Sequence, residues 1–506
     1  MSKKTTGFEL ILAPRDGRVA AYRWLYSALR DEVLSGRLQP GTRLPSTRDL
    51  ASQYDLARGT IVNAFEQLKS EGYIEGRIGS GTRVSVQLPD EVPQRSSDQS
   101  ENRLLAGRKQ KLSRYARRAQ PFSGFGDRPT RAFRCFLPAS DQFPTRLWTK
   151  ISNRHWRDIS LRMLTGCDAL GYMPLREALA DYLRRSRGVR CESRQIAIVS
   201  GTQESLDIAS RVLLDPRDKV AMENPGYSGA SLLFRAAGAK IHPTRLDREG
   251  IRVSDLPARG IRLVYVTPAH QFPTGITMTL PRRLQLLEWV RKSGAWIFED
   301  DYDSEFRYSG HPIPSLQGLD RTGQVLYAGT FSKVLFPSLR LGYLVLPANL
   351  VEPVATIKSL ISRHAPVMDQ VVLAEFIQEG HFVRHLRRMR KLYSERLSVL
   401  LREAEAHLGG LAEMSHVEAG LQTTARLHNG LDATAVAAAA AVRNVDVTPV
   451  SRYGGGKEER SVLQLGFAAI GAAEIRRGIQ ELARAIEAER KRADRGPSVL
   501  KHARQP

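Results

Sequence analysis

Cysteine is scarce in this chain, with three residues in 506, and their spacing matches neither a zinc site nor a disulfide framework. The three are Cys135, Cys167 and Cys191. The sequence also has no run of about 18 apolar residues, and no apolar segment near its N-terminus precedes a cleavage site. These absences argue against a membrane-spanning or exported protein and predict a protein of the reducing cytoplasm.

Acidic residues are also in short supply, with 53 Asp and Glu against 76 Lys and Arg, which gives a formal net charge of +23. Such an excess predicts an anionic partner, with nucleic acid as the leading candidate, or else a basic and merely solvated surface. The 42% hydrophobic content excludes a largely disordered chain. The length predicts about two or three domains, each with a core of its own.

The pattern along the chain divides it into four parts. Residues 17–85 have the pattern of a compact helical unit that ends in glycine-rich, β-prone sequence. Residues 86–130 lose apolar periodicity and hold no acidic residue between 102 and 120, which predicts a flexible basic linker, either a simple tether or a segment that seeks DNA. Residues 131–490 form the largest part, and 491–506 are expected to be a disordered tail.

Within residues 131–490, short β-rich runs alternate with amphipathic helices, a pattern typical of an α/β domain with a mostly parallel sheet. Several runs are almost continuously apolar, as strands covered on both faces are. The expected strands are residues 195–200, 219–223, 261–267, 295–299, 324–328 and 342–346.

The first of the four parts contains a helix-turn-helix pattern. Ser46 is placed to cap a helix, and Asp49 completes a capping box three residues later. A short turn leads to a second helix, whose apolar residues recur at helical spacing. In such units the start of the second helix enters the major groove, so its polar residues are candidates for phosphate and base contacts. These candidates are Arg58, Thr60 and Asn63.

Two β-prone pieces follow the second helix, around a tight turn that contains Gly79 and Gly81. We interpret them as a wing. Small residues allow the backbone to approach DNA closely, while Arg77 and Arg83 supply positive charge.

The order of these elements, with Pro-Gly-Thr-Arg-Leu-Pro-Ser at 40–46 and Gly-Ser-Gly-Thr at 79–82, resembles the GntR family of winged-helix regulators. The resemblance implies DNA contacts at six positions. They are Arg43, Ser46, Arg48, Arg58, Thr60 and Gly81. Ala57 departs from the family, which often has a capping Ser or Thr there, and the alternative is a helical hairpin with no DNA role.

The large part carries residues suited to a carbonyl cofactor that forms a Schiff base with a lysine. Lys333 follows an expected strand, at the edge where open α/β sheets bind ligands. Asp300 ends another strand, where its carboxylate would face a ring nitrogen, and Tyr302 lies two residues further on. Each signal is weak alone, since a single lysine after a strand is usually a surface residue.

A phosphate cradle is expected at the start of the helix that follows the first strand, because free backbone amides there attract anions. The residues that form this cradle are Ser200, Gly201 and Thr202, and Thr330 and Arg340 would close over the phosphate. The order and spacing of all these parts make the combined signal strong.

Five strings together resemble the fold type I aminotransferases. They are Ser-Gly-Thr-Gln at 200–203, Asn-Pro-Gly-Tyr at 224–227, His-Gln-Phe-Pro-Thr-Gly at 270–275, Glu-Asp-Asp-Tyr-Asp-Ser-Glu-Phe at 299–306 and Ser-Lys at 332–333. The resemblance implies an α/β domain with a small C-terminal α+β subdomain that binds pyridoxal 5'-phosphate.

The same resemblance implies a role for each residue of the cofactor site. Lys333 would form the Schiff base, Asp300 would pair with the pyridinium, and Tyr302 would meet the phenolate oxygen. Tyr227 would stack on the ring, with His270 beside it. Tyr172 is similar to the tyrosine that reaches the phosphate of the neighbouring subunit in aminotransferase dimers.

A GntR-type winged helix fused to such a domain resembles the MocR subfamily of regulators. This resemblance implies a domain-swapped homodimer that binds operator DNA and senses pyridoxal phosphate, or its adduct with a small amino compound, to control amino-compound or vitamin B6 genes. One alternative is an active aminotransferase with an accessory DNA-binding domain. Another is a scaffold whose cofactor is purely structural.

Two positions depart from the aminotransferase pattern. Phe272 stands where an Asn usually holds the phenolate oxygen, a loss that favours binding over turnover. Gln464 stands where many relatives grip a substrate carboxylate with an Arg, through two parallel hydrogen bonds. Three explanations stay open: the effector lacks a carboxylate, another residue such as Arg426 binds it, or the cofactor alone is the signal.

Overall fold

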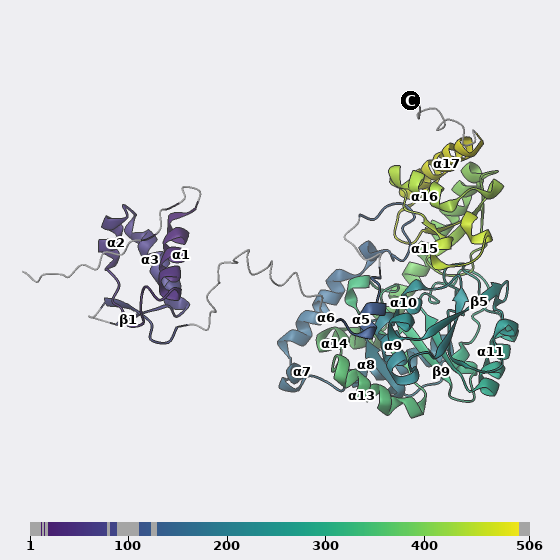
Figure 1. Cartoon of the computed structure of the whole chain (residues 1–506), viewed down its shortest axis with the longest axis horizontal. Coiled ribbons are helices and arrows are strands. Elements are labelled where there is room, and N and C mark those ends of the chain that lie inside the picture. The colour runs from purple at the N-terminus through teal and green to yellow at the C-terminus, as the bar shows by residue number, and fades with distance from the viewer. Residues whose placement is uncertain are drawn as a thin grey trace, which may run out of the picture. The chain divides into compact units, whose positions relative to one another are not determined.

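The computed structural model describes residues 12, 15, 19–77, 81–88, 111–122 and 129–494. The chain divides into two compact units, residues 1–111 and 112–506, and Figure 1 draws both. None of the described helices is long and apolar enough to cross a membrane.

The N-terminal unit is a helix-turn-helix followed by a β-hairpin. Its elements are α1 (Ala21–Leu34), α2 (Thr47–Gln53), α3 (Arg58–Ser70), β1 (Ile74–Arg77) and β2 (Gly81–Val84). The expected capping box is confirmed, because the Ser46 hydroxyl accepts from the Asp49 amide and the Asp49 carboxylate accepts from the Ser46 amide. Leu25, Leu50 and Ile61 are fully buried, so the three helices share one core.

The large unit is built on an eight-stranded sheet with the strand order β3-β10-β9-β8-β7-β4-β5-β6. The strands are β3 (Ile196–Val199), β4 (Lys219–Asn224), β5 (Lys240–Asp247), β6 (Gly250–Ile251), β7 (Ile261–Val266), β8 (Trp296–Asp301), β9 (Val325–Thr330) and β10 (Gly342–Val345). All six expected strands are present. The five strands from β9 to β5 run parallel, while β10 is antiparallel to both its neighbours and β6 to β5.

Helices cover both faces of this sheet, which explains why its strands are almost continuously apolar. One face packs against α9 (Thr202–Leu213), α10 (Ser228–Ala237) and α13 (Val351–Ile361). Side chains from α11 (Leu280–Ser293) and α12 (Leu316–Leu319) pack on the other face. Helices α8 (Met173–Arg187) and α14 (Val367–Gln378) share a further core with β3 and β10. Helix α6 (Thr145–Arg157) packs against α14, and α6 and the short α7 (Leu161–Thr165) lie at the outside of the unit (Figure 1).

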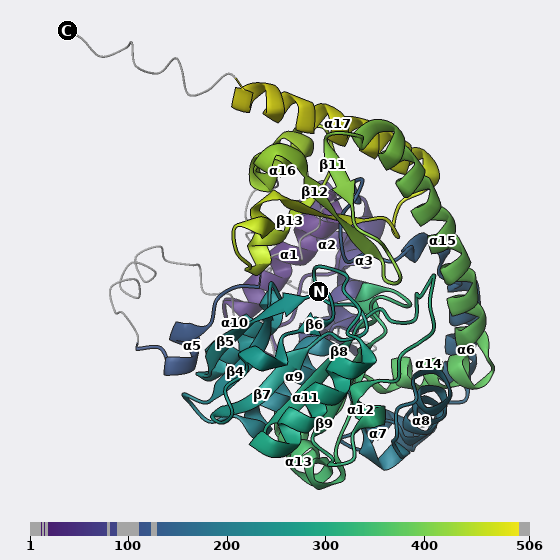
Figure 2. The ribbon, with the colours of Figure 1, turned by 90° about the vertical axis from the view of Figure 1, so that its right-hand side faces the viewer.

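A smaller α+β subdomain ends the chain, as the sequence predicts. Its sheet has the order β11 (Ala412–Met414), β12 (Gln422–Leu427), β14 (Val462–Gly466), β13 (Thr448–Pro449). Figure 2 shows α15 (His381–Leu408), α16 (Ala433–Val442) and α17 (Ala472–Asp494) around this sheet. Helix α17 runs four residues past the expected end at 490, and residues 495–506 lie outside the described residues.

Part of the expected linker is folded. Helix α5 (Arg114–Arg118) packs against α10, and the Arg118 Nε donates to the Ala236 carbonyl at 3.1 Å. The expectation of a flexible tether is therefore corrected for these five residues, because they pack on α10 and the Arg118 side chain binds a backbone carbonyl at its end. Residues 89–110 and 123–128 of that segment lie outside the described residues.

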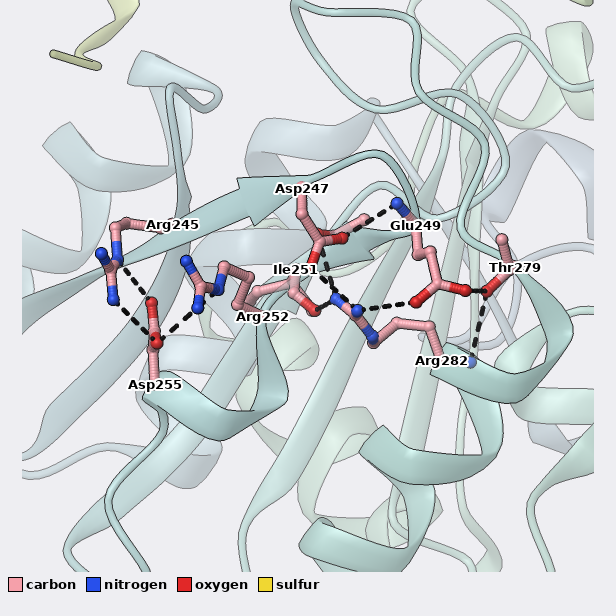
Figure 3. A network of polar contacts seen from close by, with 9 residues as sticks. Arg245, Asp247, Glu249, Ile251, Arg252, Asp255, Thr279 and Arg282 are labelled. Carbon is pink, nitrogen blue, oxygen red and sulfur yellow. Dashed lines mark hydrogen bonds and ion pairs between the residues drawn. The ribbon is translucent and has the colours of Figure 1, made fainter.

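The hairpin β5–β6 escapes the sequence analysis, because β5 is of mixed polarity and the edge strand β6 has only two residues. A buried arginine of α11 holds it in place (Figure 3). Arg282 donates to the Ile251 carbonyl at 2.6 Å, to the Asp247 carboxylate at 2.9 Å and to the Glu249 carboxylate at 3.0 Å. It also donates to the Gly250 carbonyl at 3.4 Å, so this guanidinium binds two backbone carbonyls and two carboxylates at once.

Replacing this arginine, Arg282→Ala, should lower the free energy of unfolding by about 2 kcal/mol, because it leaves a buried carbonyl and two acids without their donor. Urea unfolding followed by circular dichroism measures the loss. Arg291→Ala on the same helix is the control, because Arg291 is exposed and pairs only with Glu288, so its loss should be too small to resolve. Equal midpoints for the two variants would contradict this account of the hairpin.

Candidate functional site

The winged-helix unit presents a basic surface built from α2, α3 and the hairpin. Arg48 on α2 and both Arg58 and Asn63 on α3 are exposed, and Thr60 is half-buried. Ala57 has no side-chain cap, and the Thr60 amide donates to the Ala57 carbonyl, so the first two amides of α3 are the ones with no carbonyl of the helix to bind. These amides and the exposed Arg58 at the start of α3 suit a phosphate.

Arg43 lies against the wing. Gly81 has a φ of +84°, and a Cβ there would lie 3.0 Å from the Arg43 Nε, so only glycine fits the turn and the guanidinium together. Arg83 donates to the Gly41 carbonyl at 2.9 Å and so fastens the hairpin to the loop before α2. The side chain of Arg77 and residues 78–80 lie outside the described part of the chain.

In the large unit, the expected cofactor residues gather at the carboxyl ends of the parallel strands. Asp300 lies in β8, Lys333 follows β9, His270 follows β7 and Tyr227 follows β4. Parallel strands all end at the same edge, which is where open α/β sheets bind ligands. The structure therefore brings together residues that are up to about a hundred positions apart.

Asp300 is buried with one oxygen unused. Its Oδ2 accepts from the Tyr265 hydroxyl at 2.7 Å, while its Oδ1 has no hydrogen-bond partner among the described residues. Burial raises the pKa of this carboxyl to about 7. A protonated ring nitrogen would fit this carboxyl group. It would donate the missing hydrogen bond to Oδ1, and its positive charge would favour the charged carboxylate.

Lys333 is buried at the site and bonded to a backbone carbonyl. Its Nζ donates to the Phe136 carbonyl at 2.8 Å and lies 5.3 Å from the centre of the Phe136 ring. Burial lowers its pKa to about 8, although Asp303 and Asp300 act in the opposite direction. A lysine must be neutral to attack a carbonyl, so this environment raises the reactive fraction near neutral pH.

Tyr302 is tied to a buried pair that the sequence analysis left without a role. Asp303 accepts from the His270 Nδ1 at 3.0 Å, and the Tyr302 hydroxyl lies 3.1 Å from the same nitrogen. Asp303 also accepts from the Leu421 amide at 3.3 Å. The signal for Asp303 was its place inside the 299–306 string, but only the fold shows that it orients His270 and anchors the smaller sheet.

The first turn of α9 and Arg340 form an anion cradle. A Cβ at Gly201, whose φ is +120°, would lie 3.5 Å from both terminal nitrogens of Arg340, so the guanidinium is close to this turn. The amides of Thr202 and the residue after it belong to that turn and have no carbonyl of the helix to bind. The Ser200 amide donates to Glu204 instead, and Thr330 accepts from the Ser332 amide at 3.2 Å.

Tyr227 lies among aromatic rings. Its hydroxyl accepts from the side-chain amide of Gln203 at 3.0 Å. The rings of Phe272 and Phe122 meet the Tyr227 ring edge-on, at centroid distances of 5.7 and 5.9 Å. Phe272 is buried and also lies against the Tyr302 ring. Where aminotransferases usually have an Asn, this chain thus has an apolar side chain that cannot donate a hydrogen bond to a phenolate oxygen.

The three remaining candidates, Gln464, Arg426 and Tyr172, lie in different surroundings. Gln464 in β14 is fully buried, and both atoms of its amide lack a partner among the described residues. Arg426 lies at the exposed end of β12, two residues from Thr424, the strand partner of Gln464, and its side chain donates to the Glu458 carbonyl at 3.3 Å. Tyr172 is half-buried at the start of α8, where its amide donates to Gln370.

Comparisons with known proteins agree with both units. The family model for aminotransferase class I and II matches residues 165–482, and the model for bacterial regulatory proteins of the gntR family matches residues 21–84. The probable rhizopine catabolism regulatory protein MocR of Rhizobium meliloti is 40% identical over 478 residues, which is 94% of this chain and 95% of that protein. The chain belongs to the MocR subfamily of GntR-type transcription regulators.

Other MocR-type regulators and true aminotransferases are also similar. The HTH-type pyridoxine biosynthesis transcriptional regulator PdxR of Corynebacterium glutamicum is 30% identical over 451 residues, 88% of this chain and 91% of that protein. A solved archaeal alanine:glyoxylate aminotransferase is 28% identical with a TM-score of 0.69, and the match covers 74% of this chain and 98% of the enzyme. The large unit of this MocR-type chain therefore has the fold type I aminotransferase fold.

The lowered pKa of Lys333 gives a test that needs no cofactor. Modification of Lys333 by a small amine-reactive reagent should rise with pH around a midpoint of about 8, because burial favours the neutral amine. Mass spectrometry of the labelled peptide follows the reaction, and a lysine model peptide, with a pKa of about 10.4, is the control. A midpoint equal to that of the model peptide would contradict the geometry given for Lys333.

Proposed function

We propose that this MocR-type chain binds pyridoxal phosphate through Lys333 and senses the cofactor, or its adduct with a small amino compound, to control genes of amino-compound or vitamin B6 metabolism. The observation that carries the proposal is the meeting of Lys333, the unpaired Asp300 oxygen and the Gly201–Arg340 cradle in one site, on a chain that also has a winged helix. When bound, the cofactor supplies an aldehyde that condenses reversibly with amines.

Each residue of the site has a share in holding that group. Lys333 offers its amine, Asp300 accepts from the ring nitrogen, and the first turn of α9 with Arg340 binds the phosphate. Tyr227 faces one side of the ring. Because Phe272 offers no donor near Tyr302, control of the ring's electronics is weaker than an aminotransferase needs, which favours sensing over turnover.

The linker provides a route from this site toward the winged helix. The segment 111–122 ends beside the cofactor residues, since Phe122 meets the edge of the Tyr227 ring and α5 packs on α10. Helix α10 begins directly after Tyr227. A change at the ring of Tyr227 therefore reaches the chain segment that leads to the DNA-binding unit.

An exposed apolar surface near Tyr172 suits contact with a second copy of the chain. Large apolar side chains are exposed on α6, α7, the start of α8 and the end of α13: Trp156, Leu161, Leu164, Met173, Leu360 and Ile361. Leu161 and Leu360 are 76% and 79% exposed. A homodimer through this surface would cover them and bring two winged helices to two half-sites on DNA.

Two single substitutions should separate the two halves of this function. Lys333→Ala should remove the absorbance band of bound cofactor and abolish any effect of cofactor or amine on DNA binding, while binding by the cofactor-free protein stays as in the wild type. Arg58→Ala should keep the band and weaken DNA binding, with the salt slope of log K reduced by about 1, because one phosphate contact is lost.

The measurements are absorbance spectra and fluorescence anisotropy with duplex DNA that the wild-type chain selects from a random pool. Arg37→Ala is a matched control for Arg58, because Arg37 is already neutralised by a two-point bond to Glu32. An unchanged response of DNA binding in Lys333→Ala would reject the sensing mechanism. Sustained transamination by the wild type at about 1 per second or faster would favour the aminotransferase alternative.

A further inference from the structure

Polar residues form a row across three strands of the smaller sheet. Thr424 in β12 and Thr448 in β13 both lie opposite Gln464 in β14. Residues directly opposite each other in a sheet project from the same face. The neighbouring residues Ala425 and Leu463 project from the other face and join the core under α15 to α17. The row therefore belongs to the face that turns away from those helices.

This polar face borders the Lys333 site. A Cβ at Gly466 would lie 2.8 Å from the Cα of Cys135, so the chain at Cys135 lies directly on β14. The next residue, Phe136, supplies the carbonyl that accepts from Lys333. Burial raises the pKa of the Cys135 thiol, whereas a hydrogen bond with the Thr448 side chain acts to lower it. Thr448 therefore lies beside that thiol. Gln464 thus lies in the layer that covers the reactive lysine.

The amide of Gln464 is ready for a ligand. The side chain is fully buried, and its Nε2 and Oε1 both lack a hydrogen-bond partner among the described residues, as do those of Gln422 on the same face of β12. Thr424, its neighbour in the row, is already paired with the Ser415 hydroxyl at 2.7 Å. Buried amides are almost always paired, so an unpaired donor and acceptor together indicate a group that supplies both.

The chemistry of an amide decides which group fits. A carboxylate only accepts hydrogen bonds, so it would leave the Oε1 of Gln464 unpaired, whereas a hydroxyl accepts from Nε2 and donates to Oε1. Arg426, the candidate cation on the neighbouring strand β12, is exposed and donates to the Glu458 carbonyl. The buried acids Asp300 and Asp303 would also repel a second negative charge.

We propose that the effector of this chain is an amino alcohol: a primary amine whose far end carries a hydroxyl that Gln464 binds, in place of the carboxylate of an amino acid. The inference rests on the proposed function, because the amine nitrogen of the effector would replace the Lys333 nitrogen on the aldehyde carbon of the cofactor: one carbon–nitrogen double bond forms as the other breaks, and Lys333 leaves as the free amine.

Pairs of amines that differ only at the far end test this inference. Cofactor-loaded full-length protein would be titrated with aminobutanol and γ-aminobutyrate, and with aminopropanol and β-alanine, following the cofactor band and the heat of binding. Each alcohol should bind about tenfold or more tightly than its acid, because a site that hydrogen-bonds a hydroxyl discriminates strongly against analogues that cannot reproduce the bond. Gln464→Arg should reverse the order.

Arg426→Gln is the matched control, and it should leave the preference unchanged. Acids that bind as well as their alcohols, or better, would overturn the proposal, and so would a cofactor band that responds to neither member of a pair. Absence of the band itself would instead overturn the proposed function. The comparison within each pair on the wild-type protein decides the matter even where Gln464→Arg does not fold.

Discussion

A parallel sheet covered by helices on both faces leaves only its carboxyl edge for polar chemistry, and the large unit depends on that constraint. Strands β4, β7, β8 and β9 are mostly apolar in their first halves, and Tyr227, His270, Asp300 and Lys333 lie at or just after their carboxyl ends. Apolar layers hold the strands, and a few buried hydrogen bonds, such as Tyr265 to Asp300 and His270 to Asp303, orient the polar ends. Chemistry at this edge therefore takes place where water is largely excluded.

Desolvation at that edge acts on the acid and the base in opposite directions. It raises the pKa of Asp300 to about 7 and lowers that of Lys333 to about 8. Both groups are brought toward their neutral forms, so each gains from a partner that supplies the missing charge or bond. The same reasoning applies to Gln464, a neutral group that burial leaves with an unmet donor and acceptor. The site is thus well packed, but buried polar atoms of Asp300 and Gln464 lack hydrogen-bond partners among the described residues.

Sequence reasoning succeeded where the signal is local. The capping box of Ser46 and Asp49 spans four residues, and the strands that carry Asp300 and Lys333 are short apolar runs that end in recognisable strings. Family resemblance added the identity of the site, because those strings keep their order. Local pattern was enough for these features, since each depends on neighbours in the chain.

Features that depend on distant contacts were not predictable from the sequence. The bond between Asp303 and His270 joins residues 33 positions apart, and the hairpin β5–β6 is held by Arg282 of a later helix. Helix α5 lies in a segment whose composition is that of a tether, yet α10 provides acceptors for it. Gln464 is buried and Arg426 is exposed and bonded to the Glu458 carbonyl, a difference in burial that the sequence leaves open.

The most direct test of the account is the DNA affinity of one protein preparation in three states: free of cofactor, loaded with pyridoxal phosphate, and loaded in the presence of aminobutanol. Absorbance at each step would verify that the site is occupied. Because the two units are coupled only if occupancy changes DNA binding, the account predicts a change of about fivefold or more at one of the two steps. Equal affinity in all three states, with the cofactor band present, would contradict it.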